Sequence, residues 1–495
     1  MSRASKNINR ILFHILLMVT FLGACSPTVL VTPTPDTIDA ATVTPTPKVT
    51  STPLPVREVY APGTLVDYTA QDGDSLISVA AHFNTTEEEI RFVNPDIPED
   101  VTTLPAGYPM QIPIYYKALW GSPFKILPNA YFVDGPKQIG FDTAAFVDSQ
   151  PGWLKDYSAQ ANGVVRRGGD LVEYVAWQFS VSPRLLLAIS EFQAGALSSP
   201  TLDEAKQEYP LGFEDNTHTG FYLQLILLAD QLNTGYYRWQ TGRLESLLLM
   251  DGTMENPDPW QNAATVGIQS YFARVMISAD YKLATSEEGL SKTYMTYFGN
   301  PWLDDGANIP GSLTQPELHL PFEDGKTWAY TGGPHASWGN LEPLGALDFA
   351  PPSVAGKCSL SEDMVVAVAD GEISRTDTGV VMLDLDSDGD DRTGWVIFYL
   401  HIGSSNKIRQ GVLVTSGTPI GYPSCEGGES TGTHVHIARK YNGEWIAADG
   451  AIPFNMEGWL PHNGSEPYKG TLTRMGYTIT ASSVASYFSL ITAGK

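Results

Sequence analysis

The chain has 495 residues, of which 42% are hydrophobic and 17% charged, so it holds enough apolar material for several folded domains and is not disordered throughout. Its 30 lysines and arginines are outnumbered by 55 aspartates and glutamates, and the resulting net charge of −25 excludes a basic surface for nucleic acid. Three cysteines exclude a disulfide-dense scaffold and a cysteine-rich zinc module. Composition therefore indicates an acidic, multidomain protein.

Residues 1–24 have the features of a signal peptide for export. A basic start is followed by an apolar run over residues 11–22, which is shorter than the ~20 residues that span a bilayer. The run ends in Leu22-Gly23-Ala24-Cys25, which resembles a bacterial lipobox. The resemblance implies lipidation of Cys25 and attachment to the outer face of the bacterial cell membrane, since two or three acyl chains anchor a protein stably. A plain secretory signal with a chance cysteine is the alternative.

Residues 25–62 are rich in Thr and Pro and show no hydrophobic period. Proline-rich segments are extended and semi-rigid, at ~3.1 Å per residue. The segment is therefore predicted to be a linker that holds the rest of the chain away from the membrane, within the cell-wall layer. An O-glycosylated stalk is a compatible reading.

Residues 63–115 are predicted to form a strand, two helices and a second strand. Apolar residues spaced as on one helix face follow the turn Gly73-Asp74-Ser75, and Asp74 or Ser75 can cap this first helix. The βααβ order and these landmarks resemble the LysM domain. The resemblance implies binding of glycan that contains N-acetylglucosamine, as in peptidoglycan. The residues it places near the sugar are Gly73, Asp74, Ser75, Asn94, Pro95 and Ile97.

Residues 116–312 are predicted to be mainly α-helical, because apolar residues recur at helical spacing after capping residues. The expected helices cover residues 169–179, 182–195, 220–234, 235–249 and 259–283.

Residues 184–195 resemble the active-site helix of lysozyme-like lytic transglycosylases. Where that family has a catalytic Glu-Ser pair, this chain has Gln193-Ala194, and a glutamine cannot act as a general acid. Glu191 lies roughly 200° away around a helix of ~3.6 residues per turn. We therefore expect a degenerate, non-catalytic domain that spaces the molecule or holds glycan.

Residues 313–460 contain short β-rich runs separated by Gly, Asp and Ser turns. The predicted strands cover residues 364–369, 371–374, 380–385, 396–401, 413–414 and 434–438. This segment also holds candidate metal ligands. His434 and His436 are two residues apart, so on a strand they share one face. His401 ends an apolar strand, with its side chain expected on the Tyr399 face.

Two imidazoles and one carboxylate can hold Zn²⁺ and leave its fourth position open to water. His335 and Asp348 lie upstream of the other histidines, 13 residues apart. The whole set resembles the lysostaphin/LasA-type zinc endopeptidases of peptidoglycan. The commoner lysostaphin pattern would put its first ligand at Leu344, which cannot bind metal, whereas the LasA-like branch fits His335.

The resemblance implies a C-terminal all-β domain of the duplicated hybrid motif type, an antiparallel sheet or barrel that binds one Zn²⁺ per chain. It assigns His335, Asp348 and His436 as metal ligands and gives His401 and His434 the catalytic imidazole positions. Which of the two histidines acts as general base stays open at this point.

Two further features lie in the same segment. Cys358 and Cys425 most simply form a disulfide in an exported domain, with two free thiols as the alternative. The acidic run from Asp384 has the odd-position carboxylates of an EF-hand loop but Trp395 at position 12, so it is either an acidic turn or a partial Ca²⁺ site. The candidate Ca²⁺ ligands are Asp384, Asp386, Asp388 and Asp390.

The order of these segments predicts a membrane-anchored zinc metalloendopeptidase of the cell wall that cuts peptide cross-links of peptidoglycan and is targeted by the LysM-like module. A catalytically silent peptidoglycan-binding regulator of another hydrolase is one alternative. A secreted protease of Gly-rich proteins is another. Residues 461–495 are expected to be a C-terminal tail and suggest no function.

Overall fold

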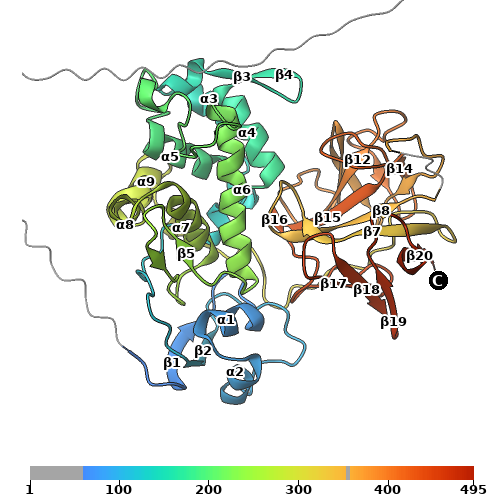
Figure 1. The fold of residues 1–495 in the computed structure, drawn as a ribbon, viewed down its shortest axis with the longest axis horizontal. Coiled ribbons are helices and arrows are strands. Elements are labelled where there is room, and N and C mark those ends of the chain that lie inside the picture. Colours follow the sequence, from blue (N-terminus) through green and yellow to red (C-terminus); the bar gives the residue numbers. More distant parts are fainter. Residues whose placement is uncertain (1–58, 353–356, 495) are drawn as a thin grey trace, which may run out of the picture. The chain divides into compact units, whose positions relative to one another are not determined.

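The described part of the chain begins with a strand, two helices and a strand (Figure 1). The structure is a computed structural model and describes residues 59–352 and 357–494, so the signal peptide, Cys25 and most of the linker lie outside the described residues. Ser75 begins the first helix with a capping box to Ser78, and Thr86 caps the second. The elements of this module are β1 (Thr64–Thr69), α1 (Leu76–Phe83), α2 (Glu87–Val93) and β2 (Pro109–Ile114).

Helices dominate the chain from residue 143 to residue 298. The predicted helix at 182–195 is present, because Ser182 caps it, Pro183 occupies its first turn and Gly195 ends it at a φ of 60°. The helices are α3 (Thr143–Asp148), α4 (Gly168–Phe179), α5 (Pro183–Ala194), α6 (Phe221–Gln240), α7 (Ala263–Val275), α8 (Ser278–Ala284) and α9 (Lys292–Phe298). Two short hairpins are β3 (Ser158–Ala161) with β4 (Val164–Arg167) and β5 (Leu247–Leu248) with β6 (Met254–Glu255).

Helix α6 differs from the prediction of two helices that meet at residue 235. It runs unbroken through Gly235, and residues 241–246 are not helical. A Cβ on Gly235 would lie 2.3 Å from the Ser270 side chain and 2.9 Å from Gly267, so α6 and α7 approach each other closely at this point. Here glycine permits helix packing and does not end the helix. The predicted helix at 259–283 is likewise wrong, because the chain bends between α7 and α8.

A nine-stranded antiparallel sheet forms the centre of the C-terminal region. Its strands follow the order β13-β10-β11-β12-β15-β8-β7-β20, and β16 pairs with β15. The bounds are β7 (Thr327–Ala336), β8 (Leu344–Ala350), β10 (Gly371–Asp377), β11 (Gly379–Asp384), β12 (Trp395–Ile402), β13 (Leu413–Val414), β15 (Val435–Tyr441), β16 (Glu444–Trp445) and β20 (Leu490–Thr492). Predicted strands match β10 to β13 and β15, whereas β7 and β8 were not predicted.

Smaller sheets flank the main one. They consist of β9 (Val365–Val366) with β14 (Pro419–Gly421), and of β17 (Leu460–Asn463), β18 (Gly470–Arg474) and β19 (Tyr477–Thr480). The last strand, β20, pairs with β7, so the end of the chain completes one edge of the main sheet.

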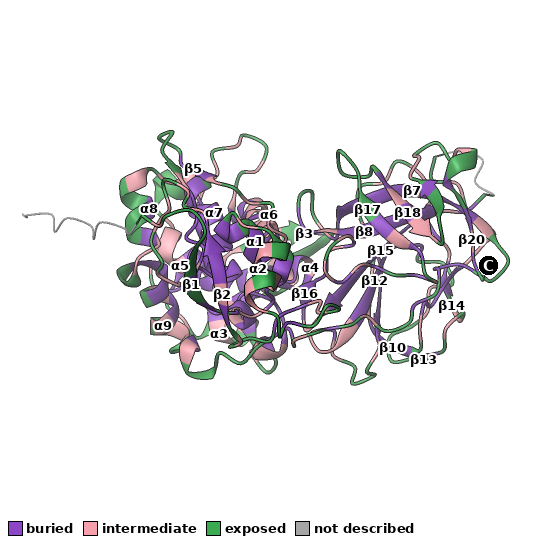
Figure 2. Ribbon diagram, turned by 90° about the horizontal axis from the view of Figure 1, so that it is seen from below, coloured by how far each residue is buried: buried purple, intermediate pink, exposed green. Residues whose placement is uncertain are grey.

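The two faces of the main sheet contribute to different apolar cores. Val396, Phe398 and Leu400 of β12 belong to a cluster that also contains the buried residues of α4 to α7. Their neighbours Ile397 and Tyr399 belong to a second cluster within the C-terminal region. Figure 2 shows buried residues along β8, β12 and β15. Because residues 59–495 form one compact unit, the helices and the sheet share a core and do not form independent domains.

Among the described residues, no helix combines the length and the apolar character that crossing a membrane requires.

Candidate metal centre

Three neighbouring strands bring together the three predicted metal ligands. His335 lies on β7, Asp348 on β8 and His436 on β15. His436 stands opposite Asp348 in the β15–β8 pairing, and His335 stands opposite Ala346 in the β7–β8 pairing. Since β15, β8 and β7 are adjacent in the sheet, ligands that are about 100 residues apart in sequence converge on one buried point.

The distances between the ligand atoms fit a tetrahedral zinc site. His335 Nε2 lies 3.0 Å from His436 Nδ1 and 3.3 Å from Asp348 Oδ1, and His436 Nδ1 lies 3.4 Å from Asp348 Oδ1. Zinc–ligand bonds of about 2.0–2.2 Å place tetrahedral ligands about 3.3–3.6 Å apart. Asp348 Oδ1 is buried and accepts no hydrogen bond, which leaves it available to a cation. The residues present therefore fit Zn²⁺.

Backbone carbonyl groups orient both imidazole ligands. His335 Nδ1 lies 2.8 Å from Gly333 O, and His436 Nε2 lies 3.0 Å from Ser337 O. A ring nitrogen that donates its hydrogen to a carbonyl leaves a lone pair on the other nitrogen. These contacts therefore direct the lone pairs of His335 Nε2 and His436 Nδ1 toward Asp348.

The electrostatics of the site favour an ionised carboxylate at Asp348 and a neutral ring at His436. Burial by itself would raise the pKa of Asp348, but the neighbouring imidazoles of His335 and His434 hold it well below its usual range. Burial lowers the pKa of His436, against the opposing effect of Asp348. A deprotonated carboxylate and neutral imidazoles are the forms that coordinate metal.

His434 and His401 lie beside the three ligands. His434 Nε2 is 3.7 Å from Asp348 Oδ1, so His434 and His436 point to one place, as their spacing predicts. The rings of His401 and His434 have centroids 4.5 Å apart. Nδ1 of His401 faces Glu426 O at 2.8 Å, and Nδ1 of His434 faces Gly432 O at 2.7 Å. Each ring thus presents Nε2 to the site.

The predicted face for His401 is wrong. Tyr399 points into the opposite core, where its hydroxyl accepts a hydrogen bond from the Val368 backbone N–H. Strict alternation would place His401 on that same face. His401 instead has a φ of 65°, a left-handed conformation that is rare for a residue other than glycine, and its ring turns toward His434. Backbone conformation, which the strand pattern does not encode, brings this imidazole into the site.

A cavity of about 960 Å³ opens over these residues. One wall contains Trp338, Gly339 and Asn340, and the other contains residues 427–433. Tyr468 also lines the cavity, and its ring stacks on His335 with centroids 4.1 Å apart. Sequence reasoning missed Tyr468, because it lies in a segment with no motif and 133 positions from the ring on which it packs.

Cys358 and Cys425 are joined by a disulfide in the structure. Thr433, which precedes His434, donates a hydrogen bond to Ser359 O at 2.6 Å. The disulfide and this hydrogen bond together fasten the 425–433 loop to the chain around residue 358.

The acidic run does not hold its four candidate Ca²⁺ ligands together. Carboxylate oxygens of Asp384, Asp386 and Asp388 approach one another within 4.8 Å. Asp390 instead forms a two-point ion pair with Arg392, at 2.8 and 2.7 Å, so its assignment as a fourth ligand is wrong. Burial and the neighbouring Asp386 together raise the pKa of Asp384 to about 7.

The loop after β1, expected to contact glycan, has internal partners instead. Asp74 is buried and accepts hydrogen bonds from the Tyr68 hydroxyl and the Gln71 backbone, while Ser75 caps α1. A Cβ on Gly73 would collide with the side chain of Gln240 on α6. The expectation of a free glycan surface at Gly73, Asp74 and Ser75 therefore needs correction, because this loop packs against helix α6.

The second expected glycan loop is more open. Pro95 is exposed, whereas Ile97 is buried and the Asn94 side chain bonds to the backbone of Gln111. On the neighbouring helix, Phe92 is 86% exposed. An aromatic side chain on this surface is not required by the core of the module.

On α5, the residues compared with a transglycosylase site have structural partners. Gln193 donates a hydrogen bond to the Tyr271 hydroxyl at 2.8 Å. Glu191 accepts hydrogen bonds from the backbone N–H groups of Leu197 and Ser198 just beyond the helix. Both side chains therefore take part in hydrogen bonds within the helical region.

Comparison with known proteins finds similarity to LasA proteins and to M23 peptidases. Residues 125–312 match the family described as LasA, N-terminal domain. The chain is 24% identical to Protease LasA of Pseudomonas aeruginosa strain PAO1 over 318 residues, which covers 60% of this chain and 72% of the relative. Its counterpart in strain UCBPP-PA14 is 25% identical over 317 residues.

Solved structures with similarity include the M23 metalloprotease Pseudoalterin from the deep sea, at 24% identity and a TM-score of 0.29, covering 34% of this chain and 96% of that one. The catalytic domain of lysostaphin from Staphylococcus simulans has 21% identity and a TM-score of 0.18, covering 25% and 88%.

Two imidazoles and one carboxylate at these distances could hold Zn²⁺ and would leave its fourth coordination position open. The chain is a zinc metalloendopeptidase that is similar to Protease LasA. When bound, Zn²⁺ supplies a Lewis acid and lowers the pKa of its water toward ~7.

Proposed function

We propose that this zinc metalloendopeptidase hydrolyses the peptide cross-links of peptidoglycan. One observation carries the proposal: the three-ligand site of His335, Asp348 and His436 lies at the base of a wide cavity that also holds two more imidazoles. A cavity of about 960 Å³ can admit a branched peptide, which a narrow single-chain cleft would exclude.

His401 and His434 are the proposed proton-transfer residues. Their Nδ1 atoms face backbone carbonyl oxygens, so each Nε2 offers a lone pair to the cavity. A neutral imidazole in this orientation can accept the proton of the attacking water. Once protonated, the ring can hydrogen-bond the oxyanion or return the proton to the leaving amine.

Targeting to the wall is the second part of the proposal. We propose that the βααβ module is a LysM domain that binds N-acetylglucosamine-containing glycan, and that Cys25 is lipidated and anchors the protein at the outer face of the cell membrane. The exposed Phe92 and Pro95 support a contact surface at the end of α2.

A metal assay combined with a muropeptide digest tests the enzymatic part. We expect one zinc per chain and new amine termini in digested peptidoglycan, both lost in His436→Ala. The control His319→Ala removes a half-exposed histidine outside the site and should keep zinc and activity. New amine termini from a Gly-rich protein but not from peptidoglycan would replace the proposed substrate, and zinc without any cleavage would favour a regulator.

Sedimentation of the full chain with peptidoglycan tests the targeting part. Phe92→Ser should reduce the bound fraction, whereas Leu360→Ser, an equally exposed apolar residue in the C-terminal region, should not. Equal retention of both variants would remove the support for a binding surface on α2.

A further inference from the structure

Residues 337–343 connect two strands that each carry a metal ligand, β7 with His335 and β8 with Asp348. At its start the loop contacts the third ligand, because Ser337 O accepts the hydrogen bond from His436 Nε2. Trp338, Gly339 and Asn340 then form one wall of the catalytic cavity. We name residues 337–343 the wall loop. Its position affects both a metal ligand and the space where a substrate lies.

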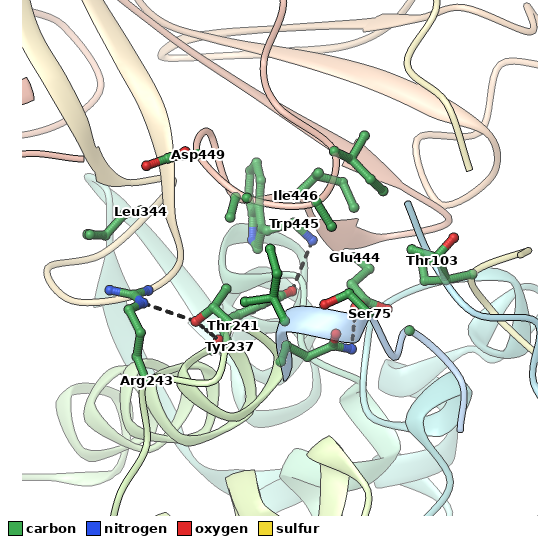
Figure 3. A pocket seen from close by; sticks show the side chains of 18 of the residues that line it. Ser75, Thr103, Tyr237, Thr241, Arg243, Leu344, Glu444, Trp445, Ile446 and Asp449 are labelled. Carbon is green, nitrogen blue, oxygen red and sulfur yellow. Dashed lines mark hydrogen bonds between the residues drawn. The ribbon is translucent and has the colours of Figure 1, made fainter. Parts of the chain in front are cut away.

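The far end of the wall loop is held by two arginines from α6 and the turn that follows it. The Glu342 carboxylate is buried, with only 3% of its side chain exposed. Arg243 contacts Glu342 Oε2 at 2.6 Å, and Arg238 contacts Oε1 at 3.3 Å. Figure 3 shows Arg243 at the end of α6, close to Leu344, where β8 begins. A buried carboxylate is stable only when it is paired, so this end of the loop requires the helix.

A second contact joins the middle of the wall loop to the same helix. Asp230 Oδ1 accepts a hydrogen bond from the Asn340 backbone N–H at 3.3 Å, and the Leu341 N–H also bonds to this carboxylate. A Cβ on Gly339 would lie 2.6 Å from Asp230 Oδ1, so the loop backbone lies directly on the helix. Leu341 is 41% exposed, so its side chain does not anchor the tip, whereas Trp338 at the start of the loop packs against the apolar core that contains α6.

We propose that helix α6 is a positioning element of the peptidase. Through Asp230, Arg238 and Arg243 it fixes the wall loop, and the fixed loop orients His436 and shapes the substrate side of the cavity. The helical region then contributes to metal affinity and substrate binding without touching substrate. This inference rests on the zinc site and not on peptidoglycan as the substrate.

The first test is Glu342→Ala in the full chain. Arg238 and Arg243 are 43% and 36% exposed, so water can solvate them when their partner is removed, and the fold should persist. Groups that orient a metal-bound histidine typically contribute about 10–100-fold to metal affinity. We expect a zinc affinity, measured by chelator competition, that is reduced by about tenfold. Faster hydrogen exchange of the Asn340 and Leu341 amides should accompany it.

Kinetics on the muropeptide substrate separate positioning from general damage. A displaced wall should raise KM more than it lowers kcat, with a loss in kcat/KM of roughly 10- to 100-fold. Glu342→Gln keeps an oxygen that accepts from one arginine and should restore most of the zinc affinity. Tyr237→Phe is the matched control, because it removes a contact of the same helix with the Trp445 backbone, away from the wall loop (Figure 3).

Asp230→Ala removes the second contact between α6 and the wall loop and is an independent test. It should produce the same pattern as Glu342→Ala, namely lower zinc affinity and faster exchange at Asn340 and Leu341. If both variants keep wild-type zinc affinity and loop exchange, or if Tyr237→Phe alters them as much, α6 does not position the loop. Failure of the proposed substrate would show differently, as a wild-type protein with normal zinc affinity that leaves peptidoglycan uncut.

Discussion

The cavity has two walls, and each is fastened by a different kind of interaction. The wall loop at 337–343 is held by charged groups of α6, from about 100 residues away in sequence. The opposite wall, at 427–433, is held within the C-terminal region by the disulfide from Cys425 to Cys358 and by the hydrogen bond from Thr433. One wall thus depends on a neighbouring region and on solution electrostatics, while the other depends on a covalent bond.

This difference has a physical consequence for how the site responds to its surroundings. Ion pairs and carboxylate hydrogen bonds weaken when pH or partners change, whereas a disulfide responds to redox conditions. Both walls meet at the strands that carry the ligands, so either wall can disturb the site. Substitutions of the metal ligands, of residues in each wall and of a helix cap far from the site separate the effects of these parts.

The largest effect is expected from the ligands themselves. His335→Ala should lose both zinc and activity, because two remaining ligands hold the metal poorly. His401→Ala should keep the metal and lose about 10²–10⁴-fold in kcat, since its ring serves proton transfer and not coordination. Metal analysis and kinetics on the same preparations check this contrast. Normal zinc binding by His335→Ala together with zinc loss in His401→Ala would show that the ligand assignment is wrong.

Removing the disulfide should have the next largest effect. Cys358 and Cys425 are separated by 67 residues, and closing such a loop contributes about 2–4 kcal/mol to the free energy of unfolding. The paired variant Cys358→Ser with Cys425→Ser should unfold at lower denaturant concentration by that amount. Dithiothreitol should lower the free energy of unfolding of the wild type by a similar amount and leave that of the double variant unchanged. If reduction released both thiols but left the stability of the wild type unchanged, the disulfide would not stabilise this wall.

The contact of Asp230 with the wall loop should make the free energy of unfolding depend on pH. Burial raises the pKa of Asp230 from 3.8 to about 6, against the hydrogen bonds from Asn340 and Leu341. The folded state therefore binds this proton more tightly than the unfolded state. The contribution of protonated Asp230 to the free energy of unfolding is fully present below pH 3.8 and is lost as pH rises toward about 6.

Asp230→Asn should remove this part of the pH dependence. Relative to wild type, the variant should gain on the order of 1 kcal/mol of unfolding free energy at pH 7.5 and little at pH 4. Chemical denaturation at the two pH values measures the difference. Parallel pH profiles for wild type and variant would show that Asp230 does not titrate with folding.

The smallest effect belongs to a cap far from both walls. Thr86 accepts a hydrogen bond from the Glu89 backbone at the start of α2, and its loss should cost about 0.5–1 kcal/mol. Thr86→Ala should lower the denaturation midpoint slightly while zinc affinity and kcat/KM stay at wild-type values. A change in zinc affinity here would mean that the module communicates with the metal centre.

Local patterns in the sequence were sufficient for features that depend on neighbouring residues. Ser75 caps α1 where the pattern allows a cap, and the predicted helix at 182–195 begins at Pro183 and is ended by Gly195. The two-residue spacing of His434 and His436 directs both rings toward Asp348. These predictions succeed because caps and strand alternation involve residues only a few positions apart.

Only the tertiary structure decided features that depend on distant partners or on one backbone angle. His401 lies on the unexpected face because its φ is 65°, and Asp390 leaves the acidic cluster because Arg392 binds it. The loop at Gly73 meets Gln240 and not solvent, and Glu342 meets Arg243 across 99 positions. Composition and periodicity carry no information about such pairings, because the sheet register and the packing of α6 place these residues together only when the whole chain folds.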